Sequence, residues 1–207
     1  MNYPNQIKTI SSATEFKLKE KSSLFIGMAF PVSSELEATE KLNEVRKKYF
    51  DATHNCYAFK IVNGLIKYSD DGEPNGTAGI RILNAINHFD FNNVLVIVTR
   101  YFGGIKLGVG PLGKAYYDTA YECLNKSEVI LKKLYNKIVL TYQFELSNFV
   151  HRTISKYNAL IEKNLFEEEP QIICMVPSEV KNKFIEELTI NSQHHIKIQD
   201  CDLLMYK

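Results

Sequence analysis

Two glycine-rich segments, Tyr68–Gly79 and Arg100–Tyr116, contain charged side chains that could do chemistry. The first segment carries three carboxylates, Asp70, Asp71 and Glu73. The second carries three cations, Arg100, Lys106 and Lys114. Carboxylate oxygens are ligands for hard cations, but Asp-Gly beside Glu-Pro is also ordinary turn chemistry. We therefore expect the three carboxylates to organise the loops and to bind no metal ion.

Arg100 could bind a phosphate or a carboxylate through two parallel hydrogen bonds. It follows a strand-forming run, and we favour a pairing with Asp70, Asp71 or Glu73 that joins the two loops. We expect five residues to organise the loops: the three carboxylates and two glycines, Gly103 and Gly104. Glycine allows sharp turns and close approaches of the backbone, so the two loops are expected to form one built surface.

The glycines Gly108, Gly110 and Gly113 surround the predicted start of a helix. Unpartnered N–H groups and the helix dipole favour anions at such a point, whereas close packing is the alternative use of these glycines. Pro111 suits the first helical position, because its missing N–H costs nothing there. The residues expected to contact nucleic acid or another anion are Tyr68, Arg100, Tyr101, Lys106, Gly108, Gly110 and Lys114.

Other reactive residue types are interpreted as structural. His54 and Cys56 lie two apart on a predicted strand, so both would face one side. A nucleophile pair is conceivable, but no third orienting group is evident from the spacing, and packing is favoured. The adjacent His194 and His195 have poor chelating geometry. We expect no catalytic residue and no cofactor.

Composition and charge limit the class of protein. The chain has 207 residues, 45% of them hydrophobic, and a net charge of +1. Residues 1–134 carry 17 basic and 14 acidic residues (+3), and residues 135–207 carry 8 and 10 (−2). Neither part is strongly basic, so any RNA contact must be local. The four cysteines have no metal or redox spacing, which predicts reduced thiols in a cytoplasmic protein.

No secretion signal or membrane-length apolar run is expected from this sequence. The front half alternates strand and helix patterns. Strands are predicted over residues 24–32, 56–62, 65–68 and 94–99, with Asn63-Gly64 as a hairpin turn. Helices are predicted after Ser34, where Glu37 completes a capping box, after the first glycine loop, and from Leu112. The run Val94–Thr99 indicates a central strand covered on both faces.

The back half has a different pattern. Strands are predicted over residues 137–146, 159–167, 171–176 and 195–205. Helices are predicted over 148–158 and after Ser178, which is expected to cap the second one. The order βαββαβ is that of a ferredoxin-like domain. The fold class is therefore α+β with two domains, residues 1–134 and 135–207.

Four motifs together closely resemble the IMPACT/YigZ family. They are His54–Tyr57, Ser69–Gly79, Val98–Gly104 and Leu107–Tyr116. The resemblance covers essentially the whole chain, with one departure at Pro111-Leu-Gly113, where the family usually has Gly-Gly-Leu. It implies that the front domain resembles domain IV of elongation factor G, including a left-handed βαβ crossover, and that the back domain resembles domain V. Periodicity could not predict this handedness, since nearly all such crossovers are right-handed.

The resemblance implies a function in translation. Eukaryotic members look like regulators that act through protein contacts during amino-acid starvation, and the family has no agreed catalytic residues. The first hypothesis is a non-catalytic, translation-associated protein that touches RNA or the ribosome through the glycine loops. Lys106, Lys114 and Arg100 would meet phosphates, and Tyr68 and Tyr101 would stack on bases.

Two alternatives remain open. Near-neutral charge also fits a module that binds a protein of the translation machinery. An enzyme is the third hypothesis, because Gly108–Gly113 faintly resembles the phosphate loop of small-molecule kinases. The absence of serines after these glycines counts against that enzyme.

Overall fold

The computed structural model describes residues 3–62, 64–166 and 168–207. It divides into two compact units, an N-terminal unit of Ile7–Leu131 and a C-terminal unit of Lys132–Lys207 that also takes in Tyr3–Gln6. The protein is an α+β protein with two sheets and five α-helices among the described residues. The change from one unit to the other falls inside a single long strand, β7 (Val129–Thr141).

The N-terminal unit contains an antiparallel sheet of five strands in the order β2-β3-β6-β4-β5. These strands are β2 (Thr14–Glu20), β3 (Ser23–Pro31), β4 (His54–Lys60), β5 (Ile66–Ser69) and β6 (Val94–Tyr101). The central strand is β6, whose residues Val94–Arg100 are all buried. The expectation of a central strand covered on both faces is confirmed, because the β-branched run leaves no polar face for solvent.

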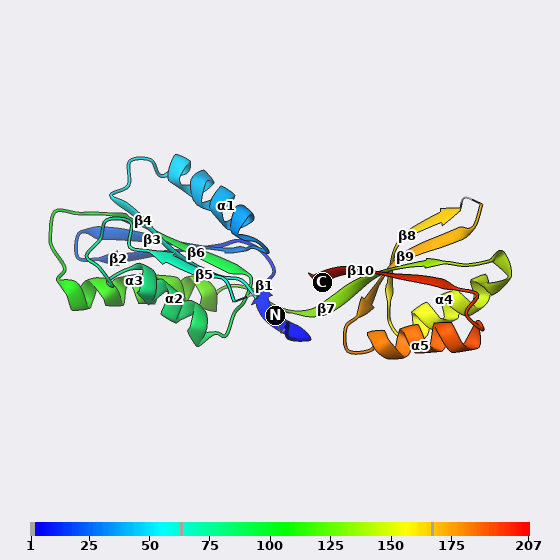
Figure 1. The fold of residues 1–207 in the computed structure, drawn as a ribbon. Coiled ribbons are helices and arrows are strands. Elements are labelled where there is room, and N and C mark those ends of the chain that lie inside the picture. Colours follow the sequence, from blue (N-terminus) through cyan, green and yellow to red (C-terminus); the bar gives the residue numbers. More distant parts are fainter. Residues whose placement is uncertain (1–2, 63, 167) are drawn as a thin grey trace. The chain divides into compact units, whose positions relative to one another are not determined.

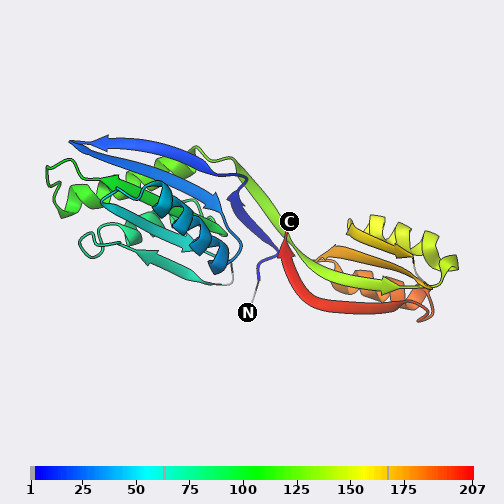
Figure 2. The same cartoon turned by 90° about the horizontal axis from the view of Figure 1, so that it is seen from above.

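Helices cover both faces of this sheet (Figures 1 and 2). One face carries α1 (Glu35–Lys48), whose Ala38, Leu42 and Val45 pack on it. The other carries α2 (Gly79–His88) and α3 (Val109–Asn125). Each helix buries an apolar stripe of helical period, which is what the sequence pattern predicts.

Strand direction brings several loops to one end of this sheet. β4 pairs antiparallel with both β5 and β6, so β5 and β6 run the same way. The segments that follow them, beginning at Asp70 and Phe102, therefore leave the sheet at the same end. The β2–β3 turn lies there too, because Leu24 is paired with Tyr101. We call this the loop end of the sheet.

The C-terminal unit follows the order βαββαβ. Its strands are β7, β8 (Leu160–Phe166), β9 (Pro170–Pro177) and β10 (Lys197–Tyr206), and its helices are α4 (Ser147–Lys156) and α5 (Lys181–Asn191). β7 lies between β10 and β9, with β8 beside β9; β1 (Gln6–Ile10) also joins β7. Both helices cover one face (Figure 1), where Ile138, Ile154 and Phe184 form the core.

Several local predictions are wrong. β7 ends at Thr141, and Phe144–Leu146 forms a 3-10 helix instead of extending the strand. Ser178 does not cap α5, which begins at Lys181; its hydroxyl accepts a hydrogen bond from the Asn136 amide. Pro111 is the third helical residue of α3, since the helix begins at Val109.

Other local details were partly right or missed. Glu37 donates its N–H to Ser34, but its carboxylate accepts from the Ser33 N–H instead of closing the box on Ser34. Gly64 has the positive φ expected of a tight turn (+84°), while Asn63 lies outside the described residues. The sequence pattern predicted neither β1 nor β2. None of the described helices is both long and apolar enough to cross a membrane.

Candidate functional site

The first glycine loop is organised by Asp70. One carboxylate oxygen accepts hydrogen bonds from the N–H groups of Ala78 and Gly79 (2.9 and 2.8 Å), and the other accepts from Gly76 (2.9 Å). Ala78 and Gly79 lie at the start of α2, where backbone N–H groups lack partners within the helix and a negative charge is favoured. Asp70 therefore closes the loop onto the helix that follows it.

Asp71 fixes the same loop to the sheet and to α1. Its carboxylate accepts from the Asn55 N–H (2.7 Å) and from the Arg46 guanidinium (3.0 Å). The backbone turns here through positive φ angles at Asp71 (+44°) and Gly72 (+88°), the second of which suits glycine. The hydrogen bonds to the Asp70 and Asp71 carboxylates therefore fix the backbone conformation of the first glycine loop.

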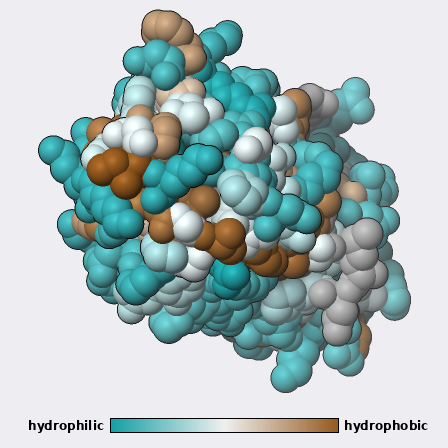
Figure 3. All heavy atoms as spheres, turned by 90° about the vertical axis from the view of Figure 1, so that its left-hand side faces the viewer, coloured by the Kyte–Doolittle hydropathy of each residue, from teal (hydrophilic) through white to brown (hydrophobic). Residues whose placement is uncertain are grey.

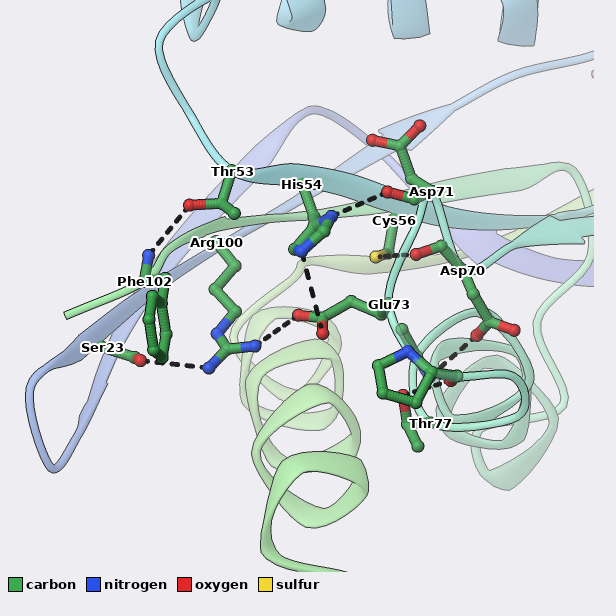
Figure 4. Close-up of polar contacts among 12 residues, drawn as sticks. Ser23, Thr53, His54, Cys56, Asp70, Asp71, Glu73, Thr77, Arg100 and Phe102 are labelled. Atoms are coloured by element: carbon green, nitrogen blue, oxygen red, sulfur yellow. Dashed lines mark hydrogen bonds and ion pairs between the residues drawn. The ribbon is translucent and has the colours of Figure 1, made fainter. Parts of the chain in front are cut away.

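A buried ion pair joins the two glycine loops (Figure 4). The Arg100 guanidinium donates to the Glu73 carboxylate at 2.6 Å, and the two side chains are only 6% and 4% exposed. Tyr116 of α3 also donates to Glu73 (2.8 Å), and Ser23 lies 3.3 Å from the second Arg100 nitrogen. Arg100 thus pairs with one of the three carboxylates considered for it.

The rings of Phe25 and Phe102 each lie 5.3 Å from the guanidinium carbon of Arg100. The Nε atom of Arg100 is buried and has no hydrogen-bond partner among the described residues. An arginine held this way supports the loops from within. Its predicted contact with a phosphate at the surface does not fit this burial.

His54 and Cys56 lie beside this pair but do not form a nucleophilic site. The Asp71 carbonyl accepts from Nδ1 of His54 (2.8 Å), so this nitrogen carries a proton, and Nε2 faces Glu73 at 3.8 Å. The Cys56 thiol donates to the Asp70 carbonyl (2.9 Å). Burial raises the pKa of Cys56 far above the ordinary range of thiols. A protonated thiol bonded to the backbone is a packing residue, as expected.

Thiol chemistry gives a direct prediction. Burial raises the pKa values of Cys123 and Cys174 to about 12, and raises that of Cys56 further. Only Cys201 is partly exposed. Because the thiolate is the reactive form, native protein treated with Ellman's reagent at pH 8 is expected to release about one equivalent of thionitrobenzoate quickly. Addition of urea should then release the other three. Fast release of two or more in native protein would contradict this burial.

The start of α3 borders a groove on the surface of the N-terminal unit. The groove has a volume of about 430 Å³ and is lined by Arg81, Asn84, Gly110, Gly113, Lys114 and Tyr117. Gly108 is the N-cap, with φ of +86° and no side-chain cap. Val109 and Gly110 therefore keep N–H groups in the first turn without partners within the helix. Two cations, a tyrosine and the helix start meet in what we call the α2–α3 groove.

Gly113 admits Arg81 to this groove. A Cβ atom at Gly113 would lie 3.3 Å from the Arg81 Nε, so a larger side chain would press on the guanidinium. Arg81 Nε donates to the Gly76 carbonyl (3.3 Å) at the end of the first glycine loop. Lys114 forms an exposed ion pair with Asp118 one turn along α3. Exposed pairs of this kind contribute little, so Lys114 can exchange Asp118 for another anion.

The remaining predicted site residues have different surroundings. Lys106 is exposed on the loop before α3, and Gly104 turns there with φ of +86°. Gly103 lies against the β2–β3 turn: a Cβ atom there would be 1.8 Å from the Ser22 carbonyl oxygen. Tyr101 donates its hydroxyl to Asp51 (2.7 Å). Tyr68 is half exposed on the edge strand β5, away from β6 by one strand.

The loop before α3 and the first residue of that helix also expose three large apolar side chains. Phe102, Ile105 and Val109 are 42%, 51% and 66% exposed. Figure 3 views the N-terminal unit from its end and shows hydrophobic patches between hydrophilic residues. No group of three or more histidine, cysteine or acidic residues that could hold a metal occurs in the part of the chain that the structure describes.

Sequence reasoning missed Arg81, Asn84, Tyr117 and Ser23 as members of these sites. Arg81 and Asn84 are one turn apart on α2 and lie beside α3 only because the two helices pack together. The glycine at position 113 indicated that a neighbouring residue could approach α3 closely there. The identity of that neighbour depends on the fold.

These features define a class of protein: an α+β protein whose N-terminal unit joins two glycine loops through a buried arginine–glutamate pair. The family model called Impact N-terminal domain matches residues 21–124, which include both loops. The chain belongs to the IMPACT family. The resemblance of the four sequence motifs to this family is thereby confirmed.

Relatives and a solved structure extend this result over the chain. "IMPACT family member YvyE" of Bacillus subtilis is 32% identical over 183 residues, which are 87% of this chain and 84% of the relative. An IMPACT family member of Haemophilus influenzae is 29% identical over 192 residues, which are 91% of this chain and 93% of the relative. A crystal structure described as a hypothetical protein has a TM-score of 0.71 at 22% identity, over 94% of this chain and 97% of its own. That similarity shows a shared fold.

Proposed function

We propose that this chain is a non-catalytic, translation-associated protein that contacts RNA, free or in the ribosome, through the loop end of its N-terminal unit. The contact surface comprises the α2–α3 groove and the loop that carries Lys106. The observation that carries the proposal is the groove, where Arg81 and Lys114 flank a helix start. A cytoplasmic location is part of the proposal, since translation takes place there.

The chemistry of the groove suits a phosphate group. An arginine can give a phosphate two parallel hydrogen bonds, and unpartnered N–H groups at a helix start favour anions. Tyr117 offers a ring on which a base could stack. A groove with two cations also agrees with the small net charge of +1, because it needs only a local attraction.

The buried groups at the loop end support binding over catalysis. Glu73, Arg100, Tyr116 and Cys56 are engaged with one another or with the backbone. Burial raises the pKa of the Tyr116 hydroxyl far above its usual range, which keeps that group protonated. Buried groups that are paired in this way are suited to positioning the loops.

We assign the N-terminal unit to the fold of elongation factor G domain IV, with a left-handed crossover from β3 through α1 to β4. The C-terminal unit is assigned to a ferredoxin-like fold resembling domain V. The strand orders β2-β3-β6-β4-β5 and β10-β7-β9-β8 support this assignment. Fold similarity alone is a weak basis for function, so the proposal depends on the groove.

A protein partner is the second candidate for the same surface. The exposed Phe102, Ile105 and Val109 favour it, because large apolar side chains left exposed within one short segment are typical of protein contacts. The two candidates differ in their response to salt and nuclease. Binding through phosphates weakens with salt, whereas binding through apolar side chains survives both treatments.

Sedimentation with ribosomal particles through a sucrose gradient tests the proposal. The wild-type chain is expected to sediment with the particles at low salt and to be released by nuclease. The variant Lys106→Ala/Lys114→Ala should lose about tenfold in bound fraction, since each phosphate contact contributes strongly at low salt. Lys47→Ala/Lys183→Ala removes two exposed lysines elsewhere and is the matched control. Equal sedimentation of both double variants would refute the assigned surface.

A further inference from the structure

A hollow of about 600 Å³ lies in the C-terminal unit, between the 3-10 helix after β7 and residues 166 and 168–170, at the end of β8 and the start of β9. Phe144 and Phe166 line it, together with Glu145, Glu168 and Glu169. The two segments are tied by a hydrogen bond from the Tyr142 N–H to the Pro170 carbonyl (3.1 Å). The hollow belongs to one unit, and the α2–α3 groove plays no part in it.

The two phenylalanines are unusually exposed. Phe144 is 72% exposed and Phe166 is 74% exposed, although burying an apolar ring away from water is favourable in free energy. Scattered apolar side chains at a surface need no explanation. Two aromatic rings lining one hollow of ligand-pocket size are different, because such pockets hold side chains or small molecules. A partner that covered both rings would remove them from water together.

Charge identifies the chemistry of that partner. Three carboxylates line the same hollow, and only Glu169 forms an ion pair with a described residue, Lys197 at 3.2 Å. The faces of aromatic rings attract cations, and so do carboxylates. RNA would be repelled by the carboxylates. The combination fits a cationic side chain with a flat or apolar body.

We propose that this hollow binds an arginine-bearing segment of a basic partner protein. The guanidinium would stack on Phe144 or Phe166 while a carboxylate accepts its N–H groups. Arginine suits this better than lysine, because its planar group can stack and donate two parallel bonds at once. The aliphatic stem of the arginine would cover the remaining apolar surface.

Fluorescence anisotropy with labelled peptides tests this inference on the full chain. The probe is a nine-residue peptide of alternating arginine and glycine, compared with the same peptide carrying lysine or glutamate. The arginine peptide is expected to bind about threefold more tightly than the lysine peptide, and the glutamate peptide should not bind. Phe144→Ala/Phe166→Ala should weaken binding about tenfold. Glu145→Gln/Glu168→Gln should weaken it about fivefold and reduce its salt dependence.

Matched variants separate the hollow from general surface effects. Phe50→Ala removes a phenylalanine that is 84% exposed on the N-terminal unit, and Glu40→Gln/Glu186→Gln removes two exposed carboxylates elsewhere. Both should bind the arginine peptide as the wild type does. Wild-type affinity in the Phe144→Ala/Phe166→Ala variant, or equal losses in the matched variants, would overturn the inference. So would the absence of arginine-peptide binding by the wild type at about 1 mM.

Discussion

Replacing Glu73 by glutamine is expected to destabilise the N-terminal unit by about 3–5 kcal/mol. The substitution leaves the shape nearly unchanged but removes the charge that faces Arg100 at 2.6 Å. Arg100 is 6% exposed at its side chain and cannot turn to water without opening the loop end. A buried charge that loses its partner costs far more than an exposed one, because its desolvation is no longer offset.

Calorimetric unfolding measures this effect. The transition of the N-terminal unit should shift to lower temperature in Glu73→Gln, while that of the C-terminal unit stays in place. Glu35→Gln is the control, since Glu35 pairs with Lys67 in an exposed position and should cost less than about 1 kcal/mol. The double variant Glu73→Gln/Arg100→Met should recover part of the loss. A Glu73→Gln protein as stable as the wild type would show that the pair does not hold the loops.

Replacing Gly103 by alanine is expected to displace the second glycine loop and to cost about 3 kcal/mol. The new Cβ atom would lie 1.8 Å from the Ser22 carbonyl oxygen and 2.2 Å from its carbon. Both are backbone atoms, so no side-chain rotation relieves the contact. Ser22 precedes Ser23, whose hydroxyl lies beside Arg100. Moving the turn therefore also disturbs the buried pair.

Gly104→Ala is the natural comparison for Gly103→Ala. Gly104 has φ of +86°, but nothing lies within 4 Å of a Cβ atom there, so only backbone strain of about 1–2 kcal/mol is expected. Hydrogen exchange of the amides in β3 and β6 reports both effects. Faster exchange is expected in Gly103→Ala than in Gly104→Ala. The reverse order would mean that the β2–β3 turn does not support the loop.

The strands and helices that were predicted correctly are those whose patterns are locally complete. The buried run Val94–Thr99 and the stripe Leu112–Leu124 each contain the whole signal for their element. The sequence pattern predicts a strand at Phe144–Leu146, because the apolar residues there continue the pattern of β7, but the segment forms a 3-10 helix. The true end of β7 is set by its partners β9 and β10, which local pattern does not reveal.

The residues of the candidate site also differ in how far the local sequence predicts them. Carboxylates in a turn and an arginine at a strand end predicted loops joined by an ion pair, but not which carboxylate would take part. Glu73 pairs with Arg100 because it is buried beside Tyr116, whereas the Asp70 and Asp71 carboxylates accept hydrogen bonds from backbone N–H groups. Arg81 and Tyr117 enter the groove only through the packing of α2 on α3. Long-range packing is the information that the local pattern lacks.

The salt dependence of binding to a labelled single-stranded RNA tests the central claim most directly. If Arg81 and Lys114 each neutralise one phosphate, the slope of log K against log salt should become shallower by about 1.4 in Arg81→Ala/Lys114→Ala, since each contact contributes about 0.7. The control Lys47→Ala/Lys183→Ala should keep the wild-type slope. An unchanged slope in the groove variant, or no measurable RNA binding by the wild type, would contradict the claim that this groove receives RNA phosphates.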